Sequence, residues 1–298
     1  MSFADLKRKS QNNFSYLQKE LEKSSSGKNV DDRFWKPEVD ASGNGYAVIR
    51  FLPAPEGETI PWAKLYSHAF QGPGGWYIEN SLTTLNEKDP VGEVNRRLWN
   101  SGSDEDKETA RKQKRKLQYY SNIYVVKDPK HPENEGKVFL FRYGKKIYDK
   151  IMEAVNGDEL EGRDGYNPFD FWTGANFKLR AKKVAGYPNY DSSEFESTGT
   201  LEDLDDAQLE SIWKREFPLQ SIVAPDQFKS YDQLQERLNS VLNLKNPEVL
   251  TQKQKAEPEE VVAATPVFNK EDDDSASQSS MVEEDDDVLD YFQKLADS

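Results

Sequence analysis

The middle of the chain, from about residue 29 to 250, carries alternating apolar and polar positions that predict a β-rich region. The stretch GNGYAVIRFLP at 43–53 is a turn followed by an apolar strand that ends at Pro53. Strand-like stretches on both sides of Gly72–Gly75 predict a hairpin. Further strands are predicted at 117–126, at 137–143 and within 176–191, and helices at about 91–115, 144–155, 201–216 and 231–243. Short strands with a few helices favour an α+β, β-rich fold, a barrel or sandwich with helical additions.

The two ends of the chain follow other patterns. Residues 1–28 form a predicted N-terminal arm with apolar positions at helical spacing, which includes the basic run Lys7, Arg8, Lys9 and Ser10. From 251 to 298 core periodicity is missing until the last residues, and the composition predicts a disordered acidic tail. A short amphipathic helix is expected at its end, where a partner protein could dock on Val288, Leu289, Phe292 and Leu295.

Charge separates the same regions. The formal net charge is −14, but the tail alone holds 14 acidic residues against 4 lysines, a net charge of −10. Residues 1–28 carry +3 and residues 91–150 carry +6. The mean hydropathy of −0.91 describes a polar chain. Its 12% of aromatic residues is high for such a chain, so some rings are available for surfaces. An acidic tail therefore hides a basic centre.

The sequence offers little to an enzyme. There is no cysteine, so disulfides, thiol nucleophiles and thiolate metal sites are excluded. The only histidines are His68 and His131, and no glycine loop carries the Lys-Ser/Thr of a phosphate-binding motif. Carboxylate pairs occur by chance among 54 acidic residues. No apolar stretch predicts a secretory signal or a membrane span, so we expect an intracellular protein. Because these residues offer no catalytic motif, we also expect no enzymatic activity.

Cations and aromatic rings recur together in three segments. KQKRKLQYY at 112–120, FLFRYGKK at 139–146 and KLRAKKVAGYPNY at 178–190 each place basic residues beside rings. Single-stranded nucleic acid needs this combination, because its phosphates attract cations and its unpaired bases stack on aromatic faces. The alternative from the residues alone is that the rings belong to the core and the cations to its rim.

Several longer stretches resemble the single-stranded DNA-binding protein family of T-even-like tailed bacteriophages. They are GNGYAVIRFLP, GGWYIE, NIYVVKDPKHPENEGKVFLFRYGKKIYDKI, GANFKLRAKKVAGYPNYD and the basic KRKS. The resemblance implies an OB-fold core at 29–250 with a helical subdomain at about 66–115. It also implies cooperative, sequence-tolerant binding of single-stranded DNA in replication, recombination and repair, inside the infected bacterial host.

The resemblance and the cation–ring pattern together give the expected interface. It comprises Arg50, Trp99, Lys112, Lys114, Arg115, Lys116, Tyr119, Tyr120, Phe141, Arg142, Tyr143, Lys145, Lys146, Lys182, Tyr187 and Tyr190. The arm is expected to contact neighbouring copies of the protein through Lys7, Arg8, Lys9 and Ser10. The tail is expected to bind phage polymerase, helicase-loading and recombination proteins.

One departure from the family concerns zinc. The best-known members of the family bind zinc through one histidine and three cysteines. His68 matches the histidine, but the cysteine positions fall near Ser81, Asp89 and Gly92. We therefore expect no metal or other cofactor, and a subdomain stabilised by packing of Trp76, Leu82, Leu85, Val94 and Leu98. Two other functions stay open from the sequence: an acidic adaptor without DNA affinity of its own, and a nuclease that uses carboxylate-bound Mg²⁺.

Overall fold

The computed structural model describes residues 31–158, 162, 164–184 and 186–244. Its contacts divide the chain into two units, Met1–Trp35 and Lys36–Ser298. The described end of the first unit contains the short strand β1 (Phe34–Trp35), preceded by an ion pair of 2.6 Å between Arg33 and Asp31. The predicted contact residues of the arm and of the tail lie outside the described residues: Lys7, Arg8, Lys9, Ser10, Val288, Leu289, Phe292 and Leu295.

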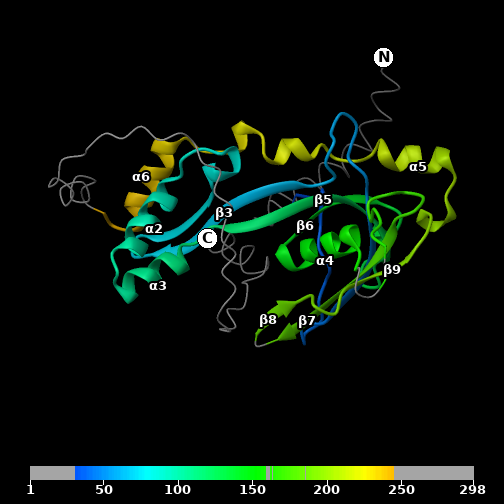
Figure 1. Cartoon of the computed structure of the whole chain (residues 1–298), viewed down its shortest axis with the longest axis horizontal. Helices are drawn as coiled ribbons and strands as arrows, with labels where there is room; N and C mark the ends of the chain where they lie inside the picture. The colour runs from blue at the N-terminus through cyan, green and yellow to red at the C-terminus, as the bar shows by residue number, and fades with distance from the viewer. Residues whose placement is uncertain (1–30, 159–161, 163, 185, 245–298) are drawn as a thin grey trace, which may run out of the picture. The chain divides into compact units, whose positions relative to one another are not determined.

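The second unit is rich in strands, most of them within 45–143 (Figure 1). They are β2 (Gly45–Phe51), β3 (Ala63–Gly72), β4 (Gly75–Asn80), β5 (Lys116–Lys127), β6 (Val138–Tyr143), β7 (Ala175–Val184), β8 (Tyr187–Asn189) and β9 (Glu194–Thr198). The α-helices are α2 (Pro90–Asn100), α3 (Asp104–Lys112), α4 (Lys145–Asn156), α5 (Asp206–Trp213) and α6 (Tyr231–Val241). Short 3₁₀ helices are η1 (Leu82–Leu85), η2 (Pro132–Asn134), η3 (Leu201–Asp203), η4 (Leu219–Ile222) and η5 (Pro225–Gln227).

Strand β5 organises the sheet. Its 12 residues pair antiparallel with β2, β3 and β6. Strand β2 also pairs with β7, and β7 pairs with β8 and β9. One strand serves these partners because they use different halves of it: β3 pairs with Lys116–Tyr120, and β2 with Ile123–Lys127. The β3–β4 hairpin extends from the first half.

The sheet curves around Phe51. Rings from both of its ends lie against this side chain: Phe141 of β6, Phe177 of β7 and Phe195 of β9 have centroids 5.7 to 6.4 Å from that of Phe51. Within the described residues no ladder joins β6 to β9, so the sheet is open. The predicted α+β, strand-rich class is confirmed, whereas the OB-type barrel stays a prediction.

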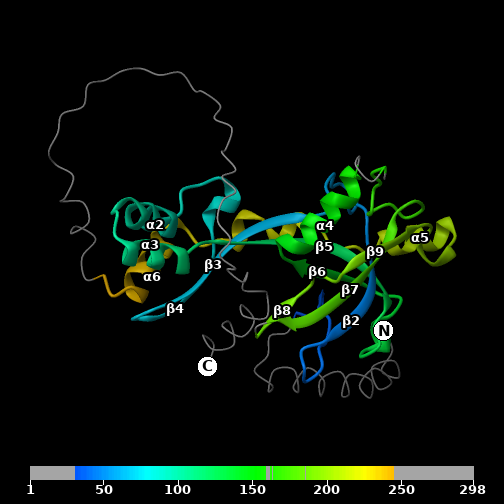
Figure 2. The same cartoon turned by 60° about the horizontal axis from the view of Figure 1, so that its bottom comes forward.

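A second hydrophobic core lies between the β3–β4 hairpin and the helices α2 and α6 (Figure 2). Its buried members are Phe70, Tyr77, Leu82, Val91, Val94, Leu234, Leu238 and Val241, with Leu85 and Leu98 packed against them. The hairpin turn touches the end of α6: the Gly74 N–H donates to the Val241 carbonyl over 2.7 Å, and a Cβ on Gly74 would meet the Ser240 carbonyl. The turn therefore requires glycine at this position.

This core agrees with the predicted packing of Leu82, Leu85, Val94 and Leu98, and adds α6, which comes from far along the chain. The predicted helix at 91–115 is divided in two at Ser101–Ser103, where Gly102 has a φ of +81°, a left-handed value that favours glycine. Strand β9 was not predicted. No helix among the described residues is long and apolar enough to cross a bilayer.

The segment after α5 returns along one side of β3 and β5, while α4 lies on the other side (Figure 1). Leu219, Phe217 and Phe228 of this segment pack on Leu65 and other apolar residues of the sheet. The Asn122 side chain fixes it by donating to the Phe217 carbonyl and accepting from the Phe217 N–H, both over 2.9 Å. The two sides of this part of the sheet thus have different surroundings.

Candidate nucleic-acid interface

The register of β3, β5 and β6 decides which predicted residues can act together. Paired residues share a face in antiparallel strands. Tyr119 pairs with Lys64 and with Tyr143, and Tyr66 pairs with Leu117; these residues share what we call the aromatic face.

The neighbouring positions belong to the opposite face. There Tyr120 pairs with Ala63 and Arg142, Gln118 pairs with Leu65, and Lys116 pairs with Ser67. The predicted set is therefore split between two surfaces, and one extended strand of DNA lying across either surface contacts only part of it.

Stacked rings line the aromatic face. The Tyr119 ring lies parallel to that of Tyr148, with centroids 3.9 Å apart and an interplanar angle of 7°, and it also stacks on Tyr143 at 5.7 Å. Trp62 meets Tyr148 edge-on at 5.8 Å. Tyr119 and Tyr143 are buried, whereas Tyr66, Tyr148 and Trp62 are half-buried. Rings that can offer a face to a base therefore stand beside rings that are already packed.

Burial is also visible in the electrostatics of this stack. Desolvation, together with the neighbouring hydroxyls of Tyr148 and Tyr66, raises the pKa of Tyr119 to about 12. Burial likewise raises the pKa of Tyr143. Both phenols stay neutral at physiological pH, so the stack has no negative charge to repel a phosphate backbone.

Cations border the half-buried rings. The Arg115 guanidinium lies 4.8 Å from the ring centroid of Tyr66, and that of Arg111 lies 5.4 Å from Trp99, which is 49% exposed. Lys64, Lys112 and Lys114 are exposed. A guanidinium over a ring keeps its charge available to a phosphate while holding the ring's orientation.

A second basic group lies at the start of α4 and on the β7–β8 hairpin. Lys146 forms an ion pair of 3.2 Å with Asp191, which follows β8, and Lys145 forms one of 2.7 Å with Asp149. The first pair brings α4 to the loop that carries Tyr190. Lys182 is exposed, and Tyr187 and Tyr190 are half-buried.

Some predicted interface residues are internal. Arg50 is 1% exposed, and its guanidinium donates to the carbonyls of Asp170, Phe171 and Gly199. Burial lowers the pKa of Arg50, against the opposing effect of Asp170. Three backbone carbonyls accept from this guanidinium, so its charge faces the interior and not a surface on which DNA could lie. Phe141 is also buried, against Phe51.

Trp62, Tyr66 and Tyr148 were not among the interface residues predicted from the sequence. Tyr148 lies two residues after Lys146 in α4, and Tyr66 lies two residues after Lys64 in β3, which puts both on one face of the strand. Both spacings were present in the sequence. The signal that was missing is the register, which places Tyr66 on the same face as Tyr119.

The four positions that resemble the family's zinc ligands come together around Asp89. One Asp89 oxygen lies 3.2 Å from His68 Nε2 and accepts from the N–H groups of Val91 and Gly92. The other accepts from the Ser81 hydroxyl over 2.8 Å and from the Leu82 N–H over 3.1 Å. The described residues contain no group of three or more His, Cys, Asp or Glu side chains arranged to hold a metal ion.

Electrostatics make the Asp89 carboxylate a charged centre. Burial raises its pKa, but the adjacent His68 imidazole and the hydrogen bonds from Ser81 and Gly92 outweigh burial and lower the pKa to about 2. The His68 ring is oriented by its Nδ1, which lies 3.0 Å from the Gln113 carbonyl at the end of α3. Asp89 therefore links β3, η1, α2 and, through His68, α3.

Half-buried rings bordered by cations on a strand-rich domain are typical of proteins that bind single-stranded nucleic acid. Residues 43–242 match the family model described as gp32 DNA binding protein like, and the chain belongs to this family.

Three similar relatives are bacteriophage proteins. The chain is 39% identical over 209 residues to the single-stranded DNA-binding protein of Enterobacteria phage T2. The aligned residues cover 70% of this chain and 69% of the relative. Identity to the protein of the same name from Enterobacteria phage T4 is 38% over 209 residues, with the same coverage. A shorter match of 55 residues, 49% identical, is to a single-stranded DNA-binding protein of Escherichia phage SV14, and it covers 18% of this chain and 49% of the relative.

Proposed function

We propose that this protein binds single-stranded DNA on its aromatic face, without catalysis and with little dependence on sequence. The observation that carries the proposal is the Arg115–Tyr66 pair beside the Tyr119–Tyr148 stack. Bases stack on the half-buried rings Tyr66, Tyr148 and Trp62, and on Tyr187 and Tyr190. Phosphates follow the half-buried Lys146 and the exposed cations Lys64, Lys112, Lys114, Arg115, Lys145 and Lys182.

The test separates stacking from charge. Tyr148→Ala removes a ring, so it should cost about 1–3 kcal/mol of binding free energy and leave the salt dependence unchanged. Arg115→Ala removes a phosphate contact, so it should weaken all sequences alike and reduce the salt slope by about one unit. Fluorescence titration with homopolymeric oligonucleotides at several salt concentrations measures both quantities.

Lys130→Ala is the matched control, because Lys130 is exposed in the loop between β5 and β6 and outside the proposed interface. Wild-type affinity in both Tyr148→Ala and Arg115→Ala would show that the strand lies elsewhere. Absence of any affinity for single strands in the intact protein would instead favour the acidic adaptor.

The family resemblance supports three further parts of the proposal. The curved sheet is an OB-type barrel, the arm at 1–28 joins neighbouring copies on DNA, and the tail at 251–298 recruits replication and recombination proteins. Removal of residues 1–22 should lower affinity for long strands and spare short oligonucleotides. Equal losses on both would mean that the arm contacts phosphate only.

We also propose that no zinc is bound and that the Asp89 network takes the place of a metal centre. The donor set supports this: it contains an imidazole and a carboxylate, and a neutral hydroxyl and a backbone N–H stand at the other two positions. Thiolates are the ligands that close a structural zinc site of this type, and the chain has none.

A further inference from the structure

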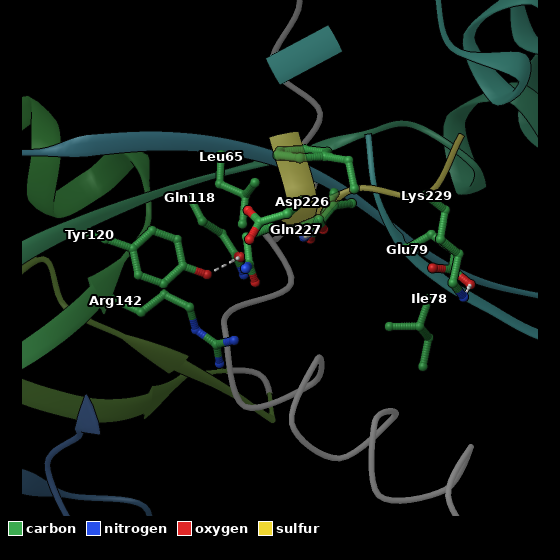
Figure 3. A pocket seen from close by; sticks show the side chains of 12 residues that line it. Leu65, Ile78, Glu79, Gln118, Tyr120, Arg142, Asp226, Gln227 and Lys229 are labelled. Carbon is green, nitrogen blue, oxygen red and sulfur yellow. Dashed lines mark hydrogen bonds and ion pairs between the residues drawn. The ribbon is translucent and has the colours of Figure 1, made fainter. Parts of the chain in front are cut away.

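A pocket of about 610 Å³ lies on the opposite face, between the sheet and the segment that leads into α6. Figure 3 shows Tyr120 and Arg142 entering it from one side, and Ile78, Glu79 and Lys229 from the other. The volume lies within the range of small-molecule sites. The pocket is lined by Tyr120 and Arg142, which lie on the opposite face from the aromatic face.

One buried group in the pocket has no partner. Ser67 is 7% exposed, and its hydroxyl makes no hydrogen bond within the described part of the chain. Buried polar groups are nearly always paired, so an unpaired hydroxyl that lines a pocket indicates a ligand that completes it.

The charges of the lining favour a neutral ligand. Arg142 and Lys229 stand against Glu79 and Asp226, a formal balance of zero, and Lys229 is already paired with Glu79 over 2.5 Å. A phosphate would need a surplus of cations, and a metal ion a surplus of carboxylates. Neither surplus exists here.

The uncharged part of the lining fits a flat ring with polar edges. The amides of Asn80, Gln118 and Gln227 each carry both a donor and an acceptor, the combination that reads base edges. Two of these amides have defined partners: Asn80 donates to the backbone carbonyl of Gln227 over 3.1 Å, and Gln118 accepts from the Tyr120 hydroxyl over 3.3 Å. The side chains of Leu65, Ile78 and Phe228 supply apolar walls for the faces of a ring.

We propose that this pocket binds one unpaired nucleobase, with the Ser67 hydroxyl and the Gln118 amide at its polar edge. The proposal rests on the function proposed above and adds to it a site that distinguishes bases, on the face away from the stacking rings. The base comes either from the bound strand or from a free nucleotide, since the recognising chemistry is the same.

The test uses the full-length protein and isothermal titration with dAMP, dCMP, dGMP and dTMP, with deoxyribose 5-phosphate as the probe that lacks a base. At least one mononucleotide should bind better than the baseless probe. Ser67→Ala should weaken that binding about 2- to 10-fold, the loss of one hydrogen bond. Ile78→Trp, which fills the pocket, should abolish it, and Ser42→Ala, the same change at an exposed turn, should leave it intact.

The same variants titrated with oligonucleotides identify the source of the base. If the base belongs to the strand, Ser67→Ala and Ile78→Trp weaken oligonucleotide binding and reduce differences between homopolymers, whether or not a mononucleotide alone is held. If it is a free nucleotide, only mononucleotide binding changes. Urea unfolding of Ile78→Trp checks that the variant is folded.

Two results overturn the proposal. Equal binding of mononucleotides and deoxyribose 5-phosphate would make the pocket an anion site. No mononucleotide binding, together with unchanged oligonucleotide affinity and base preference in Ser67→Ala and Ile78→Trp, would leave the pocket to another occupant, such as a peptide, while the proposed single-strand binding stands. Failure of the intact protein to bind oligonucleotides would count against that function instead.

Discussion

Replacing Asp89 by alanine tests whether a polar network stabilises the helical part of the protein. The carboxylate is the N-cap of α2, where it accepts from Val91 and Gly92, and it also accepts from the Ser81 hydroxyl and the Leu82 N–H. Loss of an N-cap costs about 0.5–2 kcal/mol. Each buried donor that is left without a partner costs about 1–3 kcal/mol more. Because the Ser81 hydroxyl can still donate to Thr83 Oγ1, we expect a total loss of about 3–5 kcal/mol in the free energy of unfolding.

Asp205→Ala is the matched control. Asp205 is an exposed N-cap of α5 whose side chain accepts from Gln208 N–H over 2.8 Å, so its replacement removes the cap without leaving buried donors. It should cost only the cap, about 0.5–2 kcal/mol. Urea unfolding at pH 7 gives both values, and hydrogen exchange of residues 81–98 locates the change.

The pH dependence gives a second readout of Asp89. Its pKa is lowered from the ordinary 3.8 to about 2, so the carboxylate contributes stability that is fully present above pH 4 and is lost as the pH falls toward 2. The lost contribution is about 2 kcal/mol, and Asp89→Ala should lack this part of the acid transition. If Asp89→Ala costs no more than Asp205→Ala and keeps the same acid transition, the network has no special weight and the argument is wrong.

Three other predictions concern the stability of the fold. Burial, and then the nearby Glu58, raise the pKa of Glu216 to about 9. The folded protein therefore keeps a proton that the unfolded chain loses above pH 4.5. Stability should fall as the pH rises from 4.5 to 9. Glu216→Gln should flatten this slope of about 1 kcal/mol per pH unit in urea unfolding, unlike the exposed Glu210→Gln; parallel slopes would contradict it. Gly74→Ala should cost about 1–3 kcal/mol through the clash with α6, measured as a lower urea midpoint, and loss of no stability would show that the turn yields. Metal analysis of the purified protein should find no stoichiometric zinc, and a chelator should leave the Tm unchanged; a large drop would mean that His68 and Asp89 hold a metal after all.

The sequence predicted most strands and helices because their signals are local. The hairpin at Gly72–Gly75 and the strand at 137–143 follow from turn residues and alternation, and the structure has β3, β4 and β6 there. Alternation along β6 puts Phe141 and Tyr143 on one face and Arg142 on the other, and the register of β5 with β6 agrees with this.

What the sequence could not supply is the pairing between distant segments. The burial of Arg50 depends on carbonyls more than a hundred residues away, and the partner of the 66–98 region, α6, begins only at Tyr231. The apolar run AVIRFL around Arg50 did indicate that this arginine is buried, because a strand with apolar residues on both faces is not exposed to solvent. The division of the basic and aromatic run at 112–120 between two faces required the register of β3 with β5.

The return of the chain over the opposite face has a consequence for how the aromatic face binds DNA. Binding costs free energy for every side chain and segment that becomes ordered. Here Phe217 is fixed to Asn122 by two hydrogen bonds, and the Gln220 N–H donates to Glu58, so the connection to α6 is secured on the side away from the stacking rings.

The rings themselves are ordered before any strand arrives, because Tyr148 rests on Tyr119 and Arg115 rests on Tyr66. Because the rings are already held in place, little free energy is lost in ordering them when DNA binds. Because the cations stay in solvent, salt screens their attraction to the phosphates. Such a surface should bind any sequence at similar strength and release it as ionic strength rises. Any discrimination between bases therefore comes from outside this surface, and the polar pocket around Ser67 is built of the groups that could provide it.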